Sequence, residues 1–221
     1  MAELTREHTG FEQEGLLAYQ LRNATSALDP VIRTELVRKS IHMLIALVPT
    51  LAAVFGSGIT LGLLAGGTTF YTLAEAGRQQ GKDTVLVSRI TSLSIRDRDR
   101  GHFVLGPVTL GLGAMLTMFL YPAPIAAIAI YALAFGDGLS SLIGKLAGRV
   151  SLFGGRKTLE GSLACFVAVF GVSAQFVARP EQAFLIAIGA TILEALPTDD
   201  FDNLILPLGT GFVATATFAL I

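Results

Sequence analysis

The stretch GDGLSSLIGKLAGR at residues 136 to 149 combines one carboxylate with glycines and a lysine, at the end of a long apolar run. At the centre of a membrane-spanning helix, Asp137 would cost on the order of 2.5–3.5 kcal/mol, so it must lie near the interface, in a polar cavity or on a metal. We expect a glycine-rich turn around it, with backbone amides open to a ligand. The glycines are Gly136, Gly138, Gly144 and Gly148, and the nearby cations are Lys145, Arg156 and Lys157. This composition suits a polyphosphate bound with a divalent cation.

A second polar cluster, EALPTDDFDNLILP at residues 194 to 207, is rich in oxygen ligands. Carboxylate and amide oxygens are the ligands that Mg²⁺ prefers. A short acidic loop is the alternative reading. The candidate metal ligands are Glu194, Asp199, Asp200 and Asn203, with Asp202 between them.

Two smaller polar clusters complete the set. In ELVRKSIHM, the residues Arg38, Lys39 and His42 enter an apolar segment. The simpler interpretation is two interfacial anchors and a buried histidine. In EAGR, Glu75 and Arg78 are one helical turn apart, which by itself predicts an intrahelical ion pair.

The elements that must position these clusters are apolar helices. The chain has 221 residues, of which 52% are hydrophobic and 15% charged, and its mean hydropathy is +0.64. This composition indicates an all-α, polytopic integral membrane protein. Uncharged segments at 40–74 and 101–136 each predict two helices, broken by GSG at 56–58 and by YPAP at 121–124. With single helices at 161–178, 182–197 and 204–221, we expect about seven transmembrane helices.

The charges predict the orientation in the membrane. All of the 16 Lys and Arg residues except Arg179 lie before the first span or in the segments 78–100 and 145–157. The positive-inside rule then places the N-terminus and the polar clusters in the cytoplasm. We expect a multi-pass protein of the plasma (inner) membrane of a prokaryote. The net charge of −1 and the lack of a basic stripe argue against nucleic acid as a partner.

The N-terminal residues 1–39 are expected to form a cytoplasmic helical segment, followed by a transmembrane catalytic domain at 40–221. An amphipathic helix lying on the membrane and ordinary helix packing are both open for residues 1–39. No cleaved targeting segment is visible. Cys165 has no second thiol and is interpreted as an apolar filler.

Four sequence elements resemble the membrane-bound dolichol kinase, phytol kinase and CTP-dependent diacylglycerol kinase family, which is distantly similar to CDP-diacylglycerol synthases. They occur in order as RKSIH, FGDGLSSLIGKLAGR, GRKTLEGSLACF and EALPTDDFDNLILPL. The middle two resemble the CTP-binding signature of the family. Ser140 replaces the usual Ala, Arg156 replaces the first Lys, and Phe201 and Asp202 interrupt the family's Asp-Asp-Asn element.

The resemblance implies transfer of the γ-phosphate of CTP to a long-chain lipid alcohol, with Mg²⁺, at the cytoplasmic membrane face. An isoprenoid alcohol is favoured over diacylglycerol. The implied catalytic residues are Asp137, Lys157, Asp200, His42 and Glu160, where His42, Glu160 and Asp200 are alternative proton acceptors. The implied nucleotide-binding residues are Gly136, Gly138, Gly144, Lys145, Gly148, Arg156, Lys157, Thr158, Gly161, Arg38 and Lys39. The metal ligands would be Asp137, Asp199, Asp200, Glu194 and Asn203, supported by Glu75 and Arg78.

Three other functions stay open at this stage. A CTP:phosphatidate cytidylyltransferase would use the same nucleotide and metal, but its product would retain the α-phosphate of CTP with its cytidine, and pyrophosphate would be released. A CTP-dependent diacylglycerol kinase would differ only in its acceptor. A small membrane transporter would need polar groups continuing across the membrane, whereas nearly all charges lie on one side. Thr158 and Glu160 could also serve only as the cap of a helix that begins there.

Overall fold

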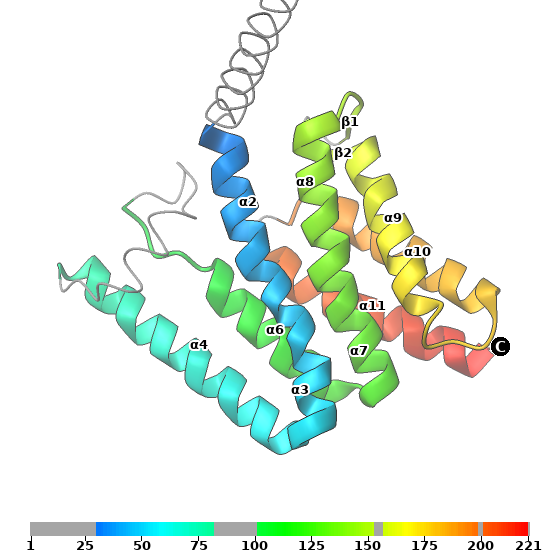
Figure 1. Cartoon of the computed structure of the whole chain (residues 1–221), viewed down its shortest axis with the longest axis horizontal. Helices are drawn as coiled ribbons and strands as arrows, with labels where there is room; N and C mark the ends of the chain where they lie inside the picture. Colours follow the sequence, from blue (N-terminus) through cyan, green and yellow to red (C-terminus); the bar gives the residue numbers. More distant parts are fainter. Residues whose placement is uncertain (1–29, 82–100, 153–156, 199–200, 221) are drawn as a thin grey trace, which may run out of the picture. The chain divides into compact units, whose positions relative to one another are not determined.

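The computed structural model describes residues 30–81, 101–152, 157–198 and 201–220 (Figure 1). The chain divides into two compact units, Met1–Arg33 and Thr34–Ile221, and the candidate site belongs to the second. The division that the sequence suggested between residues 39 and 40 falls inside helix α2 (Pro30–Met43). Residues 34–39 therefore belong to the same unit as the apolar helices.

The first helical hairpin begins with α2, which continues through the short 3-10 turn η1 (Leu44–Ala46) into α3 (Leu47–Phe55). Gly56 has a φ of 85°, a conformation that favours glycine, and it reverses the chain into α4 (Ser57–Gln79). The break expected at GSG is thereby confirmed.

The second hairpin joins α6 (Gly106–Leu120) to α7 (Ala123–Tyr131), with the chain extended at Tyr121 and Pro122. The break expected at YPAP is also confirmed. After α7 the helix does not stop. It continues as the π-helical segment η3 (Ala132–Asp137) and then as α8 (Gly138–Ala147).

The glycine-rich turn expected around Asp137 is therefore wrong, because residues 136 to 138 lie inside a continuous helix. Gly136 and Gly138 instead allow close packing. A Cβ on Gly136 would lie 3.1 Å from Cys165 Sγ, and one on Gly138 would lie 2.8 Å from Met43 Cε. A π-helical segment is rare and is frequently found at functional sites.

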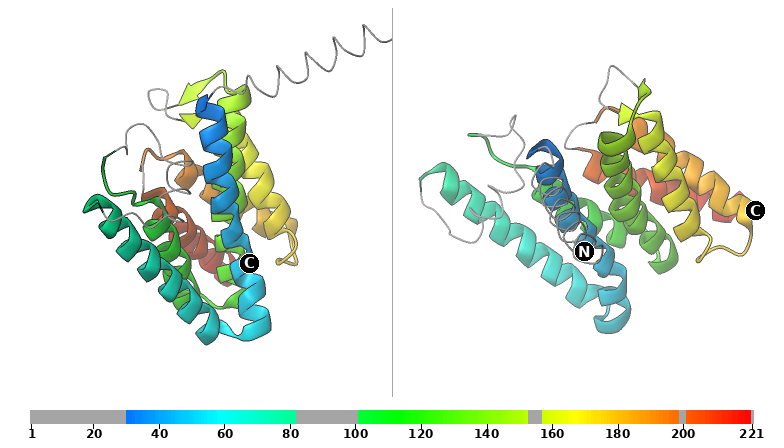
Figure 2. Two further views of the ribbon diagram at one scale, coloured as in Figure 1. Left: turned by 60° about the vertical axis from the view of Figure 1, so that its left-hand side comes forward. Right: turned by 45° about the horizontal axis from the view of Figure 1, so that its top comes forward.

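The remaining elements begin with a two-stranded antiparallel hairpin, β1 (Ser151–Leu152) and β2 (Lys157–Thr158), in which Ser151 pairs with Thr158. Three helices follow: α9 (Leu159–Ser173), α10 (Pro180–Ala195) and α11 (Asp202–Leu220). Thr158 caps α9, because its Oγ1 accepts a hydrogen bond from Gly161 N at 3.1 Å. Figure 2 shows the hairpin beside the last turn of α8 and the first turn of α9.

The central helix is α7 with η3, against which α3, α6, α9, α10 and α11 all pack. Every residue from Ile125 to Ile130 is buried, as expected for a helix that is apolar on all faces. The main core forms where this helix meets α9, α10 and α11. Its members include Ile128, Leu133, Cys165, Ile186 and Leu206.

Three helices are long and apolar enough to cross a membrane by length and composition: Thr34–Phe55, Ala123–Ala147 and Asp202–Leu220. The first and last bear large exposed apolar side chains, and so do α4 and α6. Leu47, Leu63, Phe70, Phe119 and Phe212 are each more than half exposed. Such faces suit lipid. The mostly helical fold is confirmed and is consistent with a membrane protein, whereas the count of about seven spans stays a prediction.

Candidate functional site

Asp137 is the centre of a buried charged group. It forms an ion pair with Lys39 of α2, 98 positions away in sequence. His42 Nε2 lies 3.4 Å from the same carboxylate and 3.0 Å from the carbonyl oxygen of Leu133. Because a carbonyl only accepts, Nε2 carries the proton and donates, which leaves Nδ1 as the acceptor nitrogen. Ser141 Oγ contacts the other carboxylate oxygen of Asp137 at 3.4 Å.

This pairing explains how a carboxylate is tolerated in a long apolar helix. Asp137 is 1% exposed and Lys39 is 3% exposed, so each neutralises the other away from solvent. Buried ion pairs gain little net stability, but removing one partner typically costs about 3–5 kcal/mol. Because the intact pair adds little net free energy of folding, stability alone does not explain its presence, and the pair is a candidate for function.

Glu194 forms a second buried group next to the first. Its Oε1 accepts hydrogen bonds from Lys157 Nζ at 2.6 Å and from Ser140 Oγ at 2.8 Å, and its Oε2 accepts from Ser162 Oγ at 3.3 Å. Ser140 also contacts the backbone oxygen of Asp137 at 3.2 Å, which joins the two groups. In this structure Glu194 thus pairs with the amine of Lys157. Its role as a metal ligand stays a prediction.

Lys157 interacts with both groups. Burial alone would lower its pKa, but the carboxylates of Asp137 and Glu194 outweigh burial and raise this pKa above its ordinary value. Lys157 is therefore a permanent cation at neutral pH. Asp202, at the start of α11, interacts electrostatically with Asp137, Lys39 and Lys157, so it belongs to the same charged region.

A third group forms around Glu35, which is 2% exposed. Its carboxylate pairs with Arg38 on the same helix, and it accepts a hydrogen bond from Lys145 Nζ of α8 at 2.6 Å. Arg38 and Lys145, which were both predicted to bind phosphate, therefore both pair with the buried carboxylate of Glu35. Figure 1 shows α2 and α8 side by side, as this contact requires.

The predicted ligand-binding glycines of α8 and α9 have a packing role here. A Cβ on Gly144 or on Gly148 would lie 2.9 Å from Thr158 Oγ1, and a Cβ on Gly161 would lie 2.6 Å from the oxygen of Ser140. These residues let α8 and α9 approach closely around Thr158. Their contact with a nucleotide stays a prediction.

Three predicted residues lie apart from the charged groups. Glu160 accepts from Val150 N at 3.3 Å, on the hairpin side of α9. Glu75 and Arg78 form the expected intrahelical pair, at 2.8 and 2.6 Å. This pair also binds the backbone of the segment that precedes α6. Val104 N donates to Glu75, and Arg78 donates to the carbonyl oxygen of His102.

We expect Glu75→Gln to lower the free energy of unfolding by about 1.5–3 kcal/mol, because a fully buried carboxylate that accepts charged hydrogen bonds is lost. The turnover of the folded variant should stay within about twofold of the wild type, since the pair does not contact Asp137. Denaturant unfolding in detergent, combined with a lipid phosphorylation assay, measures both. A loss of turnover without a loss of stability would place Glu75 in the reacting group.

The acidic cluster at 194–207 is only partly described. Asn203 uses its amide to join α11 to α6, donating to the oxygen of Gly106 at 3.1 Å and to Thr109 Oγ1 at 3.0 Å. Asp199, Asp200 and Arg156 lie outside the described residues. Among the residues that the structure describes, no three His, Cys, Asp or Glu side chains come together to hold a metal.

The sequence prediction omits Glu35, and it counts Asp202 in the oxygen-rich cluster without assigning it as a metal ligand. Glu35 was part of the quoted ELVRKSIHM, and its spacing of three residues from Arg38 was the available signal. In the comparison with the family motif, Asp202 is one of two residues that interrupt the Asp-Asp-Asn element. Its position in the first turn of α11 places it in the region of Asp137 and Lys157.

Comparison with curated proteins finds similarity to a phytol kinase from Synechocystis sp. The two sequences are 37% identical over 101 residues, which covers 41% of this chain and 43% of the relative. The match therefore spans less than half the length of that protein. No family model matches the chain, and no solved structure shows significant similarity to it. The match supports the resemblance to the polyprenol-type lipid alcohol kinases.

Proposed function

We propose that this chain is a CTP-dependent lipid alcohol kinase, which transfers the γ-phosphate of CTP to the hydroxyl of an isoprenoid alcohol at the cytoplasmic face of a membrane. The observation that carries the proposal is the joined pair of buried groups around Asp137 and Glu194. They lie where α2, α8, α9, α10 and α11 meet. The similarity to a phytol kinase supports a lipid alcohol as the acceptor.

The cations of the site are suited to a polyphosphate. Phosphoryl transfer depends mostly on positioning and charge neutralisation. Lys145 and Lys157 are oriented by Glu35 and Glu194, and both are less buried than those carboxylates. Phosphate oxygens would bind the amines in place of these carboxylates, and the preformed orientation reduces the entropy lost on binding.

Of the two alternative proton acceptors that the structure describes, His42 and Glu160, the contacts support His42. Glu160 accepts instead from the backbone of Val150, which precedes the β-hairpin, and Asp200, outside the described residues, stays an alternative. The imidazole of His42 touches Asp137, and its protonated Nε2 leaves Nδ1 able to take the hydroxyl proton. Asp137 would stabilise the resulting imidazolium.

A magnesium ion is expected from the resemblance, and two described carboxylates, Asp137 and Asp202, could supply part of its oxygen ligands. Asp137 Oδ1 makes only a long contact with Ser141 among the described residues, and Asp202 lies in the same charged region. Hard carboxylate oxygens suit Mg²⁺. Asp137 and Asp202, with Asp199 and Asp200 of the adjoining motif, would hold the ion. When bound, it would neutralise phosphate charge.

The decisive experiment gives the purified protein CTP labelled at either the γ or the α phosphate, with Mg²⁺, mixed lipid alcohols and phosphatidic acid. We expect label in lipid only from the γ position, in a product that comigrates with an isoprenoid phosphate. ATP should support transfer far less well than CTP. Transfer only from the α position would identify a cytidylyltransferase, and comigration with phosphatidic acid a diacylglycerol kinase. Absence of transfer from folded protein would contradict the proposal and favour transport.

A further inference from the structure

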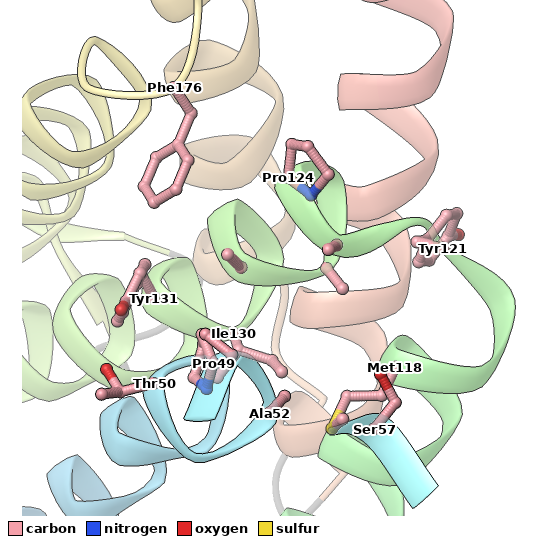
Figure 3. Close-up of a pocket in the computed structure, with 14 residues that line it drawn as sticks. Pro49, Thr50, Ala52, Ser57, Met118, Tyr121, Pro124, Ile130, Tyr131 and Phe176 are labelled. Atoms are coloured by element: carbon pink, nitrogen blue, oxygen red, sulfur yellow. The ribbon is translucent and has the colours of Figure 1, made fainter. Parts of the chain in front are cut away.

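An apolar cavity of ≈ 510 Å³ lies along α7, from Ala123 to Tyr131, on the N-terminal side of Asp137. Its walls come from α3, from α7, from the start of α4 and the end of α6, and from Phe176 after α9 (Figure 3). This volume falls in the range of roughly 300–1,000 Å³ that is usual for small-molecule sites. None of the described residues that line it is charged, and their polar groups are a few hydroxyls. Such a lining suits a hydrocarbon chain.

The cavity and the charged groups are carried by the same two helical segments. Tyr131 lines the cavity, and Asp137 follows six residues later, which is about 9 Å at the rise of an α-helix. On the other segment, Thr50 lines the cavity and His42 precedes it by eight residues, about 12 Å. A ligand with a polar head and an apolar tail could therefore contact both.

A row of aromatic rings extends from the cavity toward the turn of the helix that carries Asp137. Phe135, two residues before Asp137, stacks on Tyr131 with ring centroids 5.9 Å apart. Tyr131 in turn lies 6.0 Å from Phe176, and both of these rings line the cavity, as Figure 3 shows. Phe135 and Tyr131 are half-buried and Phe176 is 39% exposed, so the row presents an accessible apolar surface.

We propose that this cavity binds the apolar tail of the lipid substrate, at the end remote from its hydroxyl. The inference rests on the proposed function, which places the hydroxyl at His42 and Asp137. The tail then follows Phe135 and Tyr131 into the cavity. Each buried methylene contributes about 0.8 kcal/mol in general, so the cavity selects long tails over short ones.

The test fills the cavity without disturbing the core. Ala53 lines the cavity but is exposed, so Ala53→Trp adds bulk there at little cost to folding. The matched control is Ala65→Trp, at an exposed position on α4 outside the cavity. Turnover is measured with phytol and with geraniol, whose tail is shorter. We expect Ala53→Trp to lower kcat/KM for phytol at least tenfold, the equivalent of about two buried methylenes, and to leave geraniol within about twofold.

Equal losses for both alcohols, or none for phytol, would overturn the inference, as would the same effect in Ala65→Trp. If the wild type phosphorylates neither alcohol, the proposed function fails, and the cavity is tested separately. A phytol analogue with a diazirine at its tail end should then label residues 118–131 in the wild type, compete with phytol and fail to label Ala53→Trp. Labelling elsewhere, or displacement by phosphatidylglycerol vesicles but not by phytol, counts against a tail site.

Discussion

Replacing Asp137 by Asn is expected to reduce phosphate transfer by roughly 10²–10³-fold, because the carboxylate that orients His42 and completes the charged group is lost. The same change should also destabilise the fold by about 3–5 kcal/mol, since it leaves Lys39 buried without its counter-ion. A loss of activity in this variant alone would therefore not separate catalysis from folding.

A double variant separates them. Lys39→Met together with Asp137→Asn removes both buried charges, and we expect it to recover most of the lost stability, because a buried ion pair contributes little net free energy. Its transfer activity should stay as low as that of Asp137→Asn. Thermal unfolding in detergent and the labelled-CTP assay measure the two quantities. Recovery of activity along with stability would show that the Lys39–Asp137 pair is purely structural.

The helices could be predicted because their signals are local. The uncharged lengths, the GSG at 56–58 and the prolines at 121–124 each act over a few residues, and the structure has breaks at those places. Lys39 and His42 lie beside Asp137, and Ser140 joins this group to Glu194 and Lys157, because alternate hairpins return the chain to one end of the bundle. The predicted cluster of Glu75 and Arg78 lies apart from them. In this sense Lys39, His42, Asp137 and Lys157 could be grouped from topology alone.

The partners within the site could not be predicted. The pairing of Lys39 with Asp137 rather than with Glu35, and of Lys157 with Glu194, depends on the packing of α2, α8 and α10, which no local signal encodes. The turn expected around Asp137 failed for a related reason. In isolation Gly136 and Gly138 favour a turn. In the folded protein they lie in a continuous helix, and their lack of a side chain lets Cys165 and Met43 pack closely against it. Tertiary contacts overrode local propensity at the candidate site residue itself.

Lys157→Ala is the second variant with a large expected effect, a loss of about 10²–10³-fold in kcat for transfer from CTP. Lys157 is the cation shared by the Asp137 and Glu194 groups, and it is charged at neutral pH because nearby carboxylates raise its pKa. The fold should tolerate the change better than Asp137→Asn, since Ser140 and Ser162 continue to donate to Glu194. Melting temperature and single-turnover kinetics with γ-labelled CTP measure the two effects.

Two further variants identify what Lys157 does. Lys157→Arg keeps the charge and should retain a measurable part of the turnover, although a planar guanidinium fits a site built for an amine less well. Arg149→Ala removes an exposed cation from the same segment, outside the three charged groups, and should stay within about twofold of the wild type. If the charge near the β-hairpin merely attracts CTP from solution, Arg149→Ala and Lys157→Ala will raise KM alike and leave kcat unchanged. A fall in kcat confined to Lys157→Ala instead assigns this amine to the phosphoryl group in the transition state, where added charge must be neutralised as the bond to the leaving phosphate breaks.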